Sequence, residues 1–183
     1  MEKIEKLKRI FKNENIDGYI IPKNDEFFGE YVQECNDRLK FISSFTGSYG
    51  FALVLKNKNF LFVDGRYTLQ AKNQSGKIFK IITIPDKMPN ELLIGKKLSI
   101  GFDPKLFTEK SLLIFFGKNK FKLKPISQNL IDLIWKRRIV KNSNKFYLLP
   151  NEAINENHQL KINKISRYLK KKKSDFLFVT ASE

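Results

Sequence analysis

Hydrophobic positions in this chain form short runs, and the clearest pair lies in the first third of the sequence. Residues 51–55 and 60–63 are nearly continuous apolar segments, and the residues between them, 56–59, alternate lysine and asparagine. This pattern predicts two antiparallel strands joined by a tight polar connection. Because apolar residues do not alternate with polar ones, we expect both faces of this hairpin to be covered.

Helical and strand patterns alternate along the chain. Ile4, Leu7 and Phe11 recur at helical spacing within residues 1–13, and a short buried strand over 19–21 ends at Pro22. Apolar spacing, proline and glycine predict further helices over 27–32, 68–75, 90–94, 109–116 and 130–135, and further strands over 78–84, 98–102 and 121–123. The predicted fold class is α/β, with a mixed sheet flanked by helices.

A change in composition and an internal repeat predict a second domain. Displacing the N-terminal segment by 158 positions (162 − 4) places Ile4 on Ile162 and Asp17 on Asp175, and places the strand at 19–21 on residues 177–179. We therefore expect a first domain at 1–140, a linker at 141–150 and the truncated start of a second, similar domain at 151–183. A strand at 176–179 would need partners that follow residue 183.

The formal net charge of +16 comes from 35 Lys and Arg residues against 19 Asp and Glu residues, spread along the whole chain. Clustered basic residues would indicate nucleic-acid binding, but dispersed lysines favour a solvated surface instead, so nucleic acid is an unlikely partner. No apolar run approaches the roughly 20 residues of a membrane span, and the N-terminus lacks the apolar core of a secretory signal. With a single cysteine, Cys35, the chain suits a reducing compartment, so we expect a cytoplasmic protein with no membrane partner.

The residues themselves indicate no catalytic centre. His158 is the only histidine and lies in a polar stretch ahead of a helix, where a solvated or capping role is expected. Cys35 has no histidine nearby in the sequence, and we interpret it as a structural thiol. Phosphate-binding glycine motifs and paired cysteines are absent from the sequence, so the sequence predicts no metal site and no bound cofactor in this chain.

Several short motifs, in a fixed order, together resemble a known family. They are YIIP at 19–22 with Asp25, RLKFISSFTGSYG at 38–50, FVDGRY at 62–67 with LQA at 69–71, GFDP at 101–104, NLIDLIW at 129–135 and VTASE at 179–183. The set resembles the N-terminal part of the Xaa-Pro aminopeptidases (aminopeptidase P) of the long, three-domain kind, within the creatinase/prolidase superfamily.

The resemblance implies a non-catalytic first domain with a ribonuclease-H-like fold, a similar second domain of which this chain holds the start, and a third, catalytic domain beyond residue 183. In that family the missing C-terminal domain holds two manganese-type ions on two Asp, one His and two Glu residues, and hydrolyses the bond before proline. The implied partners are this missing domain, a second copy in a homodimer, and a peptide substrate.

The resemblance also singles out a few residues of this chain. The loop of Phe45, Thr46, Gly47 and Ser48 corresponds to one that approaches the partner subunit's active site in dimeric relatives, which makes it a candidate loop for substrate access or for the interface. A tight entry to a buried strand is the alternative. Where creatine-hydrolysing relatives place a basic residue in this loop, Gly47 and Ser48 are not basic. Structural or cross-subunit contacts are expected for four more residues, namely Arg38, Asp64, Arg66 and Tyr67.

Two other functions remain open at this point. The same N-terminal architecture occurs without catalysis in the large subunit of a histone chaperone, so a protein-interaction module is one alternative. A basic nucleic-acid-binding domain is the other, and it would require a localised patch of positive charge.

Overall fold

The structure is a computed structural model. It describes residues 2–95, 97–117, 122–138, 145 and 147–179, apart from the side chain of Asn151. The chain divides into two compact units, Met1–Val140 and Lys141–Glu183, each of which is described by itself.

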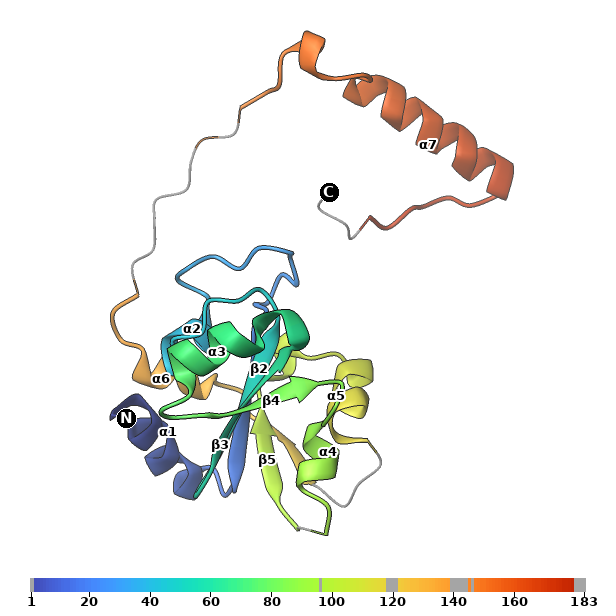
Figure 1. Ribbon diagram of the computed structural model, residues 1–183. Coiled ribbons are helices and arrows are strands. Elements are labelled where there is room, and N and C mark those ends of the chain that lie inside the picture. Colours follow the sequence, from blue (N-terminus) through green and yellow to red (C-terminus); the bar gives the residue numbers. More distant parts are fainter. Residues whose placement is uncertain (1, 96, 118–121, 139–144, 146, 180–183) are drawn as a thin grey trace. The chain divides into compact units, whose positions relative to one another are not determined.

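The first unit is built on a six-stranded mixed sheet with the strand order β4-β3-β2-β1-β5-β6 (Figure 1). The strands are β1 (Gly18–Pro22), β2 (Gly50–Leu55), β3 (Asn59–Asp64), β4 (Lys80–Ile84), β5 (Ser99–Phe102) and β6 (Lys122–Pro125). β1 pairs antiparallel with β2 and β2 antiparallel with β3, whereas β1–β5, β3–β4 and β5–β6 are parallel. Among the described strands, β2 alone therefore runs against the others.

Helices cover both faces of the sheet, as the unbroken apolar runs predicted. One core cluster joins residues of α1 (Glu2–Asn13), α2 (Arg38–Ser43), α3 (Thr68–Ser75) and α6 (Leu130–Ile134) to the first face of the sheet. The other cluster joins α5 (Glu109–Phe116) and the region of α4 (Pro89–Leu92) to the second face. Successive residues of β1 alternate between the two clusters: Ile20 belongs to the second, and Tyr19 and Ile21 belong to the first.

The predicted hairpin forms β2 and β3, with Phe51 opposite Phe62 and Leu53 opposite Phe60. Gly50 opens β2 at φ +156°, and a Cβ there would lie 2.7 Å from the carbonyl oxygen of Phe62. Glycine is therefore required at the point where the loop enters the sheet.

One sequence prediction differs from the structure, and a few others are not tested by it. Residues 27–32 form no helix but an irregular loop. The helix in this region is instead α2, which begins after Asp37, whose side chain accepts a hydrogen bond from the amide of Lys40. Residues 176–179, predicted as a strand whose partners would follow residue 183, are unpaired in the structure, so this strand stays a prediction. Phe121 of the predicted strand 121–123 and half of the predicted linker 141–150 lie outside the described residues.

The second unit contains a short 3-10 turn (Asn151–Ala153) and the helix α7 (His158–Lys172). Asn157 caps α7 by accepting from the amide of Leu160, and Lys173 ends it in a left-handed conformation. Its apolar side chains Leu160, Ile162, Ile165 and Tyr168 are exposed. In the part of the chain that the structure describes, no helix has the length and apolar character needed to cross a membrane.

Candidate functional site

The candidate site is the edge of the sheet at which most strands end. Because β2 alone is reversed, its amino end lies at the same edge as the carboxyl ends of its neighbours β1 and β3. The loops 23–37, 44–49, 64–67 and 103–107 therefore meet there. Ligand sites of open α/β sheets are commonly built at such an edge.

The loop that precedes β2 is held in place by the core beneath it and by hydrogen bonds to α3. Phe45 is fully buried in the first core cluster. The amide of Thr46 donates to Gln74 Oε1 (3.0 Å), and the Thr46 hydroxyl accepts from Gln70 Nε2 (2.8 Å) and Gln74 Nε2 (2.9 Å). Both glutamines belong to α3, so this helix fixes the path of the loop.

Gly47 and Ser48 connect this loop to Tyr67 after β3. A Cβ on Gly47 would lie 2.2 Å from the Phe45 ring and 2.9 Å from the Tyr67 ring, so glycine is needed for this close approach. The Ser48 hydroxyl and the Tyr67 hydroxyl are hydrogen-bonded at 2.7 Å. The Phe45 and Tyr67 rings meet edge to face, with centroids 5.9 Å apart. The two motifs that the sequence singled out on either side of the hairpin thus form one contiguous structure.

Asp64 and Arg66 form an exposed ion pair at the end of β3. The Arg66 amide donates to Asp64 Oδ1 (2.9 Å), and Arg66 Nη2 lies 2.7 Å from Asp64 Oδ2. The hydrogen bond from the Arg66 side chain lowers the pKa of Asp64 below its usual value. The guanidinium also lies over the Tyr67 ring, 5.2 Å from its centroid. This pair caps the 3-10 turn Gly65–Tyr67 that leads into α3.

Arg38 belongs to a different, buried network. Its guanidinium is only 3% exposed and contacts Asp132 of α6 (Nε to Oδ1, 2.7 Å) and Glu26 of loop 23–37 (Nη2 to Oε1, 2.6 Å). Asp132 also pairs with Arg138. Burial is the largest single influence on the pKa of Glu26 and would raise it, but the hydrogen bonds from Arg38, a backbone hydrogen bond and the positive charges of Arg38 and Arg138 together lower this pKa below its usual value. Arg38 therefore ties loop 23–37 to α6. None of its hydrogen bonds described here involves Ser48 or Tyr67.

Loop 23–37, which includes the segment 27–32 that was wrongly predicted to be helical, is fixed at several points. Buried Asp25 accepts from the amide of Phe27 (3.1 Å) and from Asn36 Nδ2 (3.1 Å). Lys23 Nζ lies 2.6 Å from Asp37 Oδ2, and both side chains are mostly buried. Asn24 Nδ2 donates to the carbonyl of Leu106 (3.0 Å). The loop is thus anchored at both ends and in its middle.

This anchored loop nevertheless exposes aromatic side chains. Phe27 and Tyr31 are 82% and 86% exposed, and Phe28 is about half exposed. Phe28 also has a left-handed backbone (φ +53°), which is unfavourable for a bulky residue. Backbone strain of this kind is typical of functional segments. In the sequence, Phe27 and Tyr31 stand four residues apart, which is the helical spacing behind the prediction of a helix at 27–32.

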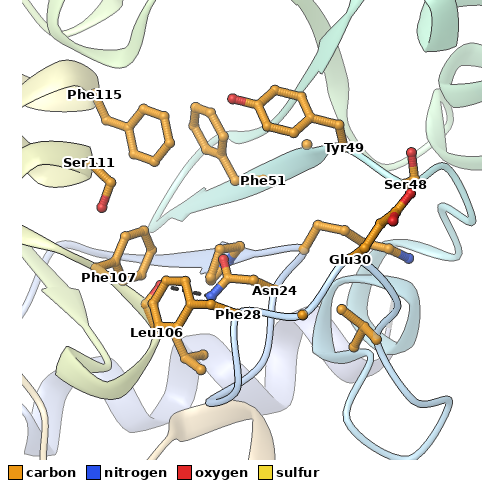
Figure 2. Close-up of a pocket in the computed structure, with 15 residues that line it drawn as sticks. Asn24, Phe28, Glu30, Ser48, Tyr49, Phe51, Leu106, Phe107, Ser111 and Phe115 are labelled. Carbon is orange, nitrogen blue, oxygen red and sulfur yellow. Dashed lines mark hydrogen bonds between the residues drawn. The ribbon is translucent and has the colours of Figure 1, made fainter. Parts of the chain in front are cut away.

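Next to this loop lies a cavity of about 310 Å³. It lies between loop 23–37, the start of β2 and α5 (Figure 2). Its lining includes Asn24, Phe28, Glu30, Ser48, Tyr49, Phe51, Phe107, Ser111 and Phe115. Sequence reasoning identified Ser48 alone among these, because the cavity is assembled from segments far apart in the chain. Among the described residues, no group of three or more His, Cys, Asp or Glu side chains could hold a metal ion.

Comparison with known proteins identifies the first unit. The family model of the creatinase/prolidase N-terminal domain matches residues 3–140. The chain belongs to this family. The creatinase/prolidase N-terminal domain accounts for the six-stranded mixed sheet and its helices, and its match ends where the first compact unit ends.

Full-length relatives extend the similarity beyond this domain. A probable Xaa-Pro aminopeptidase P of Coprinopsis cinerea is 30% identical over 95% of this chain, and one of Blastomyces gilchristii is 34% identical over 94%. In both cases the match covers 30% of the relative, so the chain spans about a third of the length of these curated relatives.

Solved structures agree in fold. The X-prolyl aminopeptidase of Caenorhabditis elegans, described as a cytosolic enzyme with a di-nuclear active site, matches 95% of this chain and 31% of its own, with a TM-score of 0.79 and 28% identity. The N-terminal domain of the peptidase PepQ from Mycobacterium tuberculosis matches 73% of this chain and 98% of its own, with a TM-score of 0.56 and 21% identity. The second similarity shows the fold alone.

Proposed function

We propose that this chain is the non-catalytic N-terminal portion of a metal-dependent aminopeptidase that hydrolyses the peptide bond between an N-terminal residue and a following proline. The observation that carries the proposal is the similarity to the C. elegans enzyme, which extends over 95% of this chain but only 31% of that enzyme. The similarity to the Xaa-Pro aminopeptidases P, at about the same share of their length, supports it.

The catalytic part of the parent protein would follow this chain. There, two manganese-type ions would activate a water molecule for attack on the peptide bond. The di-nuclear active site of the C. elegans enzyme supports a pair of ions, and this chain itself is expected to bind none. The parent would be a cytoplasmic homodimer with peptide substrates.

In the parent protein, the first unit serves substrate access and oligomerisation. The rigid loop of Phe45, Thr46, Gly47 and Ser48, braced by α3 and Tyr67, is suited to approach a site supplied by another domain or subunit. The segment 64–67 lies next to that loop, and its shape is held by contacts among Asp64, Arg66 and Tyr67. Arg38 holds loop 23–37 in place. The second unit is the start of a similar domain, in which α7 would take the place that α1 has in the first unit.

The proposal is tested by comparing this chain with its extension into the downstream reading frame. Both proteins are incubated with Mn²⁺ and an Ala-Pro-Ala peptide, and release of alanine is measured. We expect no release by the 183-residue chain and robust release by the extended protein.

A matched peptide in which alanine replaces proline controls for general aminopeptidase activity. Cleavage by the 183-residue chain would contradict its non-catalytic role. An extended protein that cleaves neither peptide would instead support the non-enzymatic interaction module.

A further inference from the structure

The cavity of about 310 Å³ beside loop 23–37 has aromatic walls. Phe51, Phe107 and Phe115 pack against one another, with the Phe51 and Phe115 centroids 4.3 Å apart and those of Phe107 and Phe115 6.3 Å apart. Figure 2 shows Phe51, Phe115 and Tyr49 on one side of the hollow and Phe28 and Phe107 on the other. Its volume is at the low end for ligand pockets, so the cavity suits a single side chain better than a folded segment.

The side-chain amide of Asn24 is fixed between these walls. Its Nδ2 donates to the carbonyls of Leu106 (3.0 Å) and Asp25 (3.2 Å), which determines the orientation of the amide. The opposite atom, Oδ1, has no hydrogen-bond partner among the described residues, and Figure 2 shows it directed between the aromatic rings. Asn24 therefore offers the cavity an acceptor.

The other polar groups of the lining also favour a donor ligand. The Ser111 hydroxyl donates its hydrogen to the carbonyl of Thr108 (2.7 Å) and accepts from the Thr108 amide (3.0 Å), so one lone pair remains to accept a hydrogen bond. Glu30 brings a carboxylate to the lining and makes no ion pair within the described part of the chain. The one cation of the lining, Lys23, is neutralised by Asp37 at 2.6 Å. The Tyr49 hydroxyl can accept as well as donate.

We propose that this cavity binds the guanidinium side chain of an arginine in a peptide. The half-exposed rings of Phe28 and Tyr49 offer faces that attract a cation, the Glu30 carboxylate complements its charge, and the oxygens of Asn24 and Ser111 accept its hydrogen bonds. Arginine fits better than lysine because its planar group stacks on aromatic rings and carries five donors. This site shares only Ser48 with the Phe45–Ser48 loop and does not depend on hydrolysis of the peptide.

The test measures binding of acetyl-Ala-Arg-Ala-amide to the 183-residue chain by NMR, with the Asn24 side-chain amide as the reporter. We expect saturable shifts of this signal. The same peptide with citrulline, which keeps the shape but lacks the charge, is expected to bind at least tenfold more weakly. Equal affinity for the two peptides would overturn the proposal, and so would equal affinity for free arginine, because the site would then not be specific for a peptide.

Two variants locate the site. Glu30→Gln removes one charge on the cavity, and Phe115→Leu removes one aromatic wall; each is expected to weaken the arginine peptide at least fivefold. Glu109→Gln, which removes an exposed charge from α5 away from the lining, is the matched control and should leave binding unchanged. Thermal unfolding confirms that each variant is folded. Unchanged affinity in both cavity variants would overturn the assignment.

The outcome is separable from that of the proposed function. An extended protein that fails to cleave Xaa-Pro peptides, while this chain binds the arginine peptide, would refute only the peptidase proposal. Cleavage by the extended protein, without arginine binding here, would refute only the cavity proposal.

Discussion

The two units contain the same sequence pattern in opposite environments. Ile4 and Leu7 of α1 are 2% and 0% exposed, whereas their counterparts in α7, Ile162 and Ile165, are 52% and 40% exposed. The strand residues that follow differ likewise: residues 19–21 lie in the central strand β1, and residues 177–179 are exposed and unpaired. The same pattern therefore yields a helix in both places but a strand and a core in only one.

The difference shows which forces act locally. α7 has what a helix needs within its own sequence, namely the Asn157 cap and a lysine-rich last turn. A strand has no such local support, because its hydrogen bonds are made with neighbours. β1 has β2 and β5 beside it, and the part of the chain described here contains no corresponding strands in the second unit.

The largest predicted difference concerns matched core substitutions. Leu7→Ala should lower the free energy of unfolding of the first unit by about 2–5 kcal/mol, because it leaves a cavity in a packed core. Ile165→Ala should change it by less than about 0.5 kcal/mol, since the side chain is exposed and alanine favours helix. Urea unfolding followed by Trp135 fluorescence measures both. A loss above about 1.5 kcal/mol for Ile165→Ala would show that α7 is packed.

Substitutions of helix caps should also affect the stability of the two units differently, but by a smaller amount. Asp37→Ala removes the cap of α2 and leaves Lys23 buried without its partner, so we expect a loss of about 2–4 kcal/mol in the first unit. Asn157→Ala should reduce the helical stability of α7 by about 1 kcal/mol.

Circular dichroism at 222 nm and urea unfolding distinguish the two capping effects. The Asn157 variant should lose helical signal without a change in the unfolding midpoint of the first unit. A shifted midpoint in that variant would argue against the independence of the second unit.

The smallest predicted difference is in how stability depends on pH, and it concerns Asp17 and Asp175, which occupy equivalent positions in the internal repeat. Lys56 Nζ (2.6 Å) and the Ser99 amide (3.0 Å) bond to the Asp17 carboxylate and lower its pKa. The resulting stability is present above the unfolded-state pKa, near 3.8, and is lost as pH falls through the lower folded-state value. Because the pair is partly exposed, the contribution is about 1 kcal/mol or less.

Urea midpoints measured between pH 5 and about pH 2.5 test this dependence. Asp17→Asn should flatten the profile of the first unit in the acid range, whereas Asp175→Asn should leave it unchanged. Identical profiles for the wild type and Asp17→Asn would contradict the role of this carboxylate.

Most of the fold could be predicted from the sequence, because its elements carry local signals. The hairpin, the helix over 109–116 and the strand over 98–102 all follow from apolar runs and stop signals. α2 was missed because its six residues are too few to show a helical period, and its buried Arg38 does not read as a core residue. Only the contacts with Glu26 and Asp132 make its burial favourable.

The candidate site was predictable only in part. Glycines and an Asp-Gly-Arg-Tyr exit marked the loops around the hairpin, and those loops do meet through Ser48 and Tyr67. The cavity could not be foreseen, since Asn24, Phe51 and Ser111 come together only through the pairing of β1 with β2 and the packing of α5. Side chains brought together by topology leave no spacing pattern in the sequence.

The order of strands also affects how the first unit can form during synthesis. Tyr19 of the central strand receives a hydrogen bond from the Leu130 amide (3.4 Å), and Lys124 Nζ reaches the Glu14 carbonyl (2.5 Å). α1 and β1 are made first, yet α6, which completes their core cluster, is made last. In a nascent chain, the part of the apolar face of α1 that packs on α6 therefore stays uncovered until residues 130–134 have left the ribosome, and aggregation or chaperone binding would be favoured in this interval.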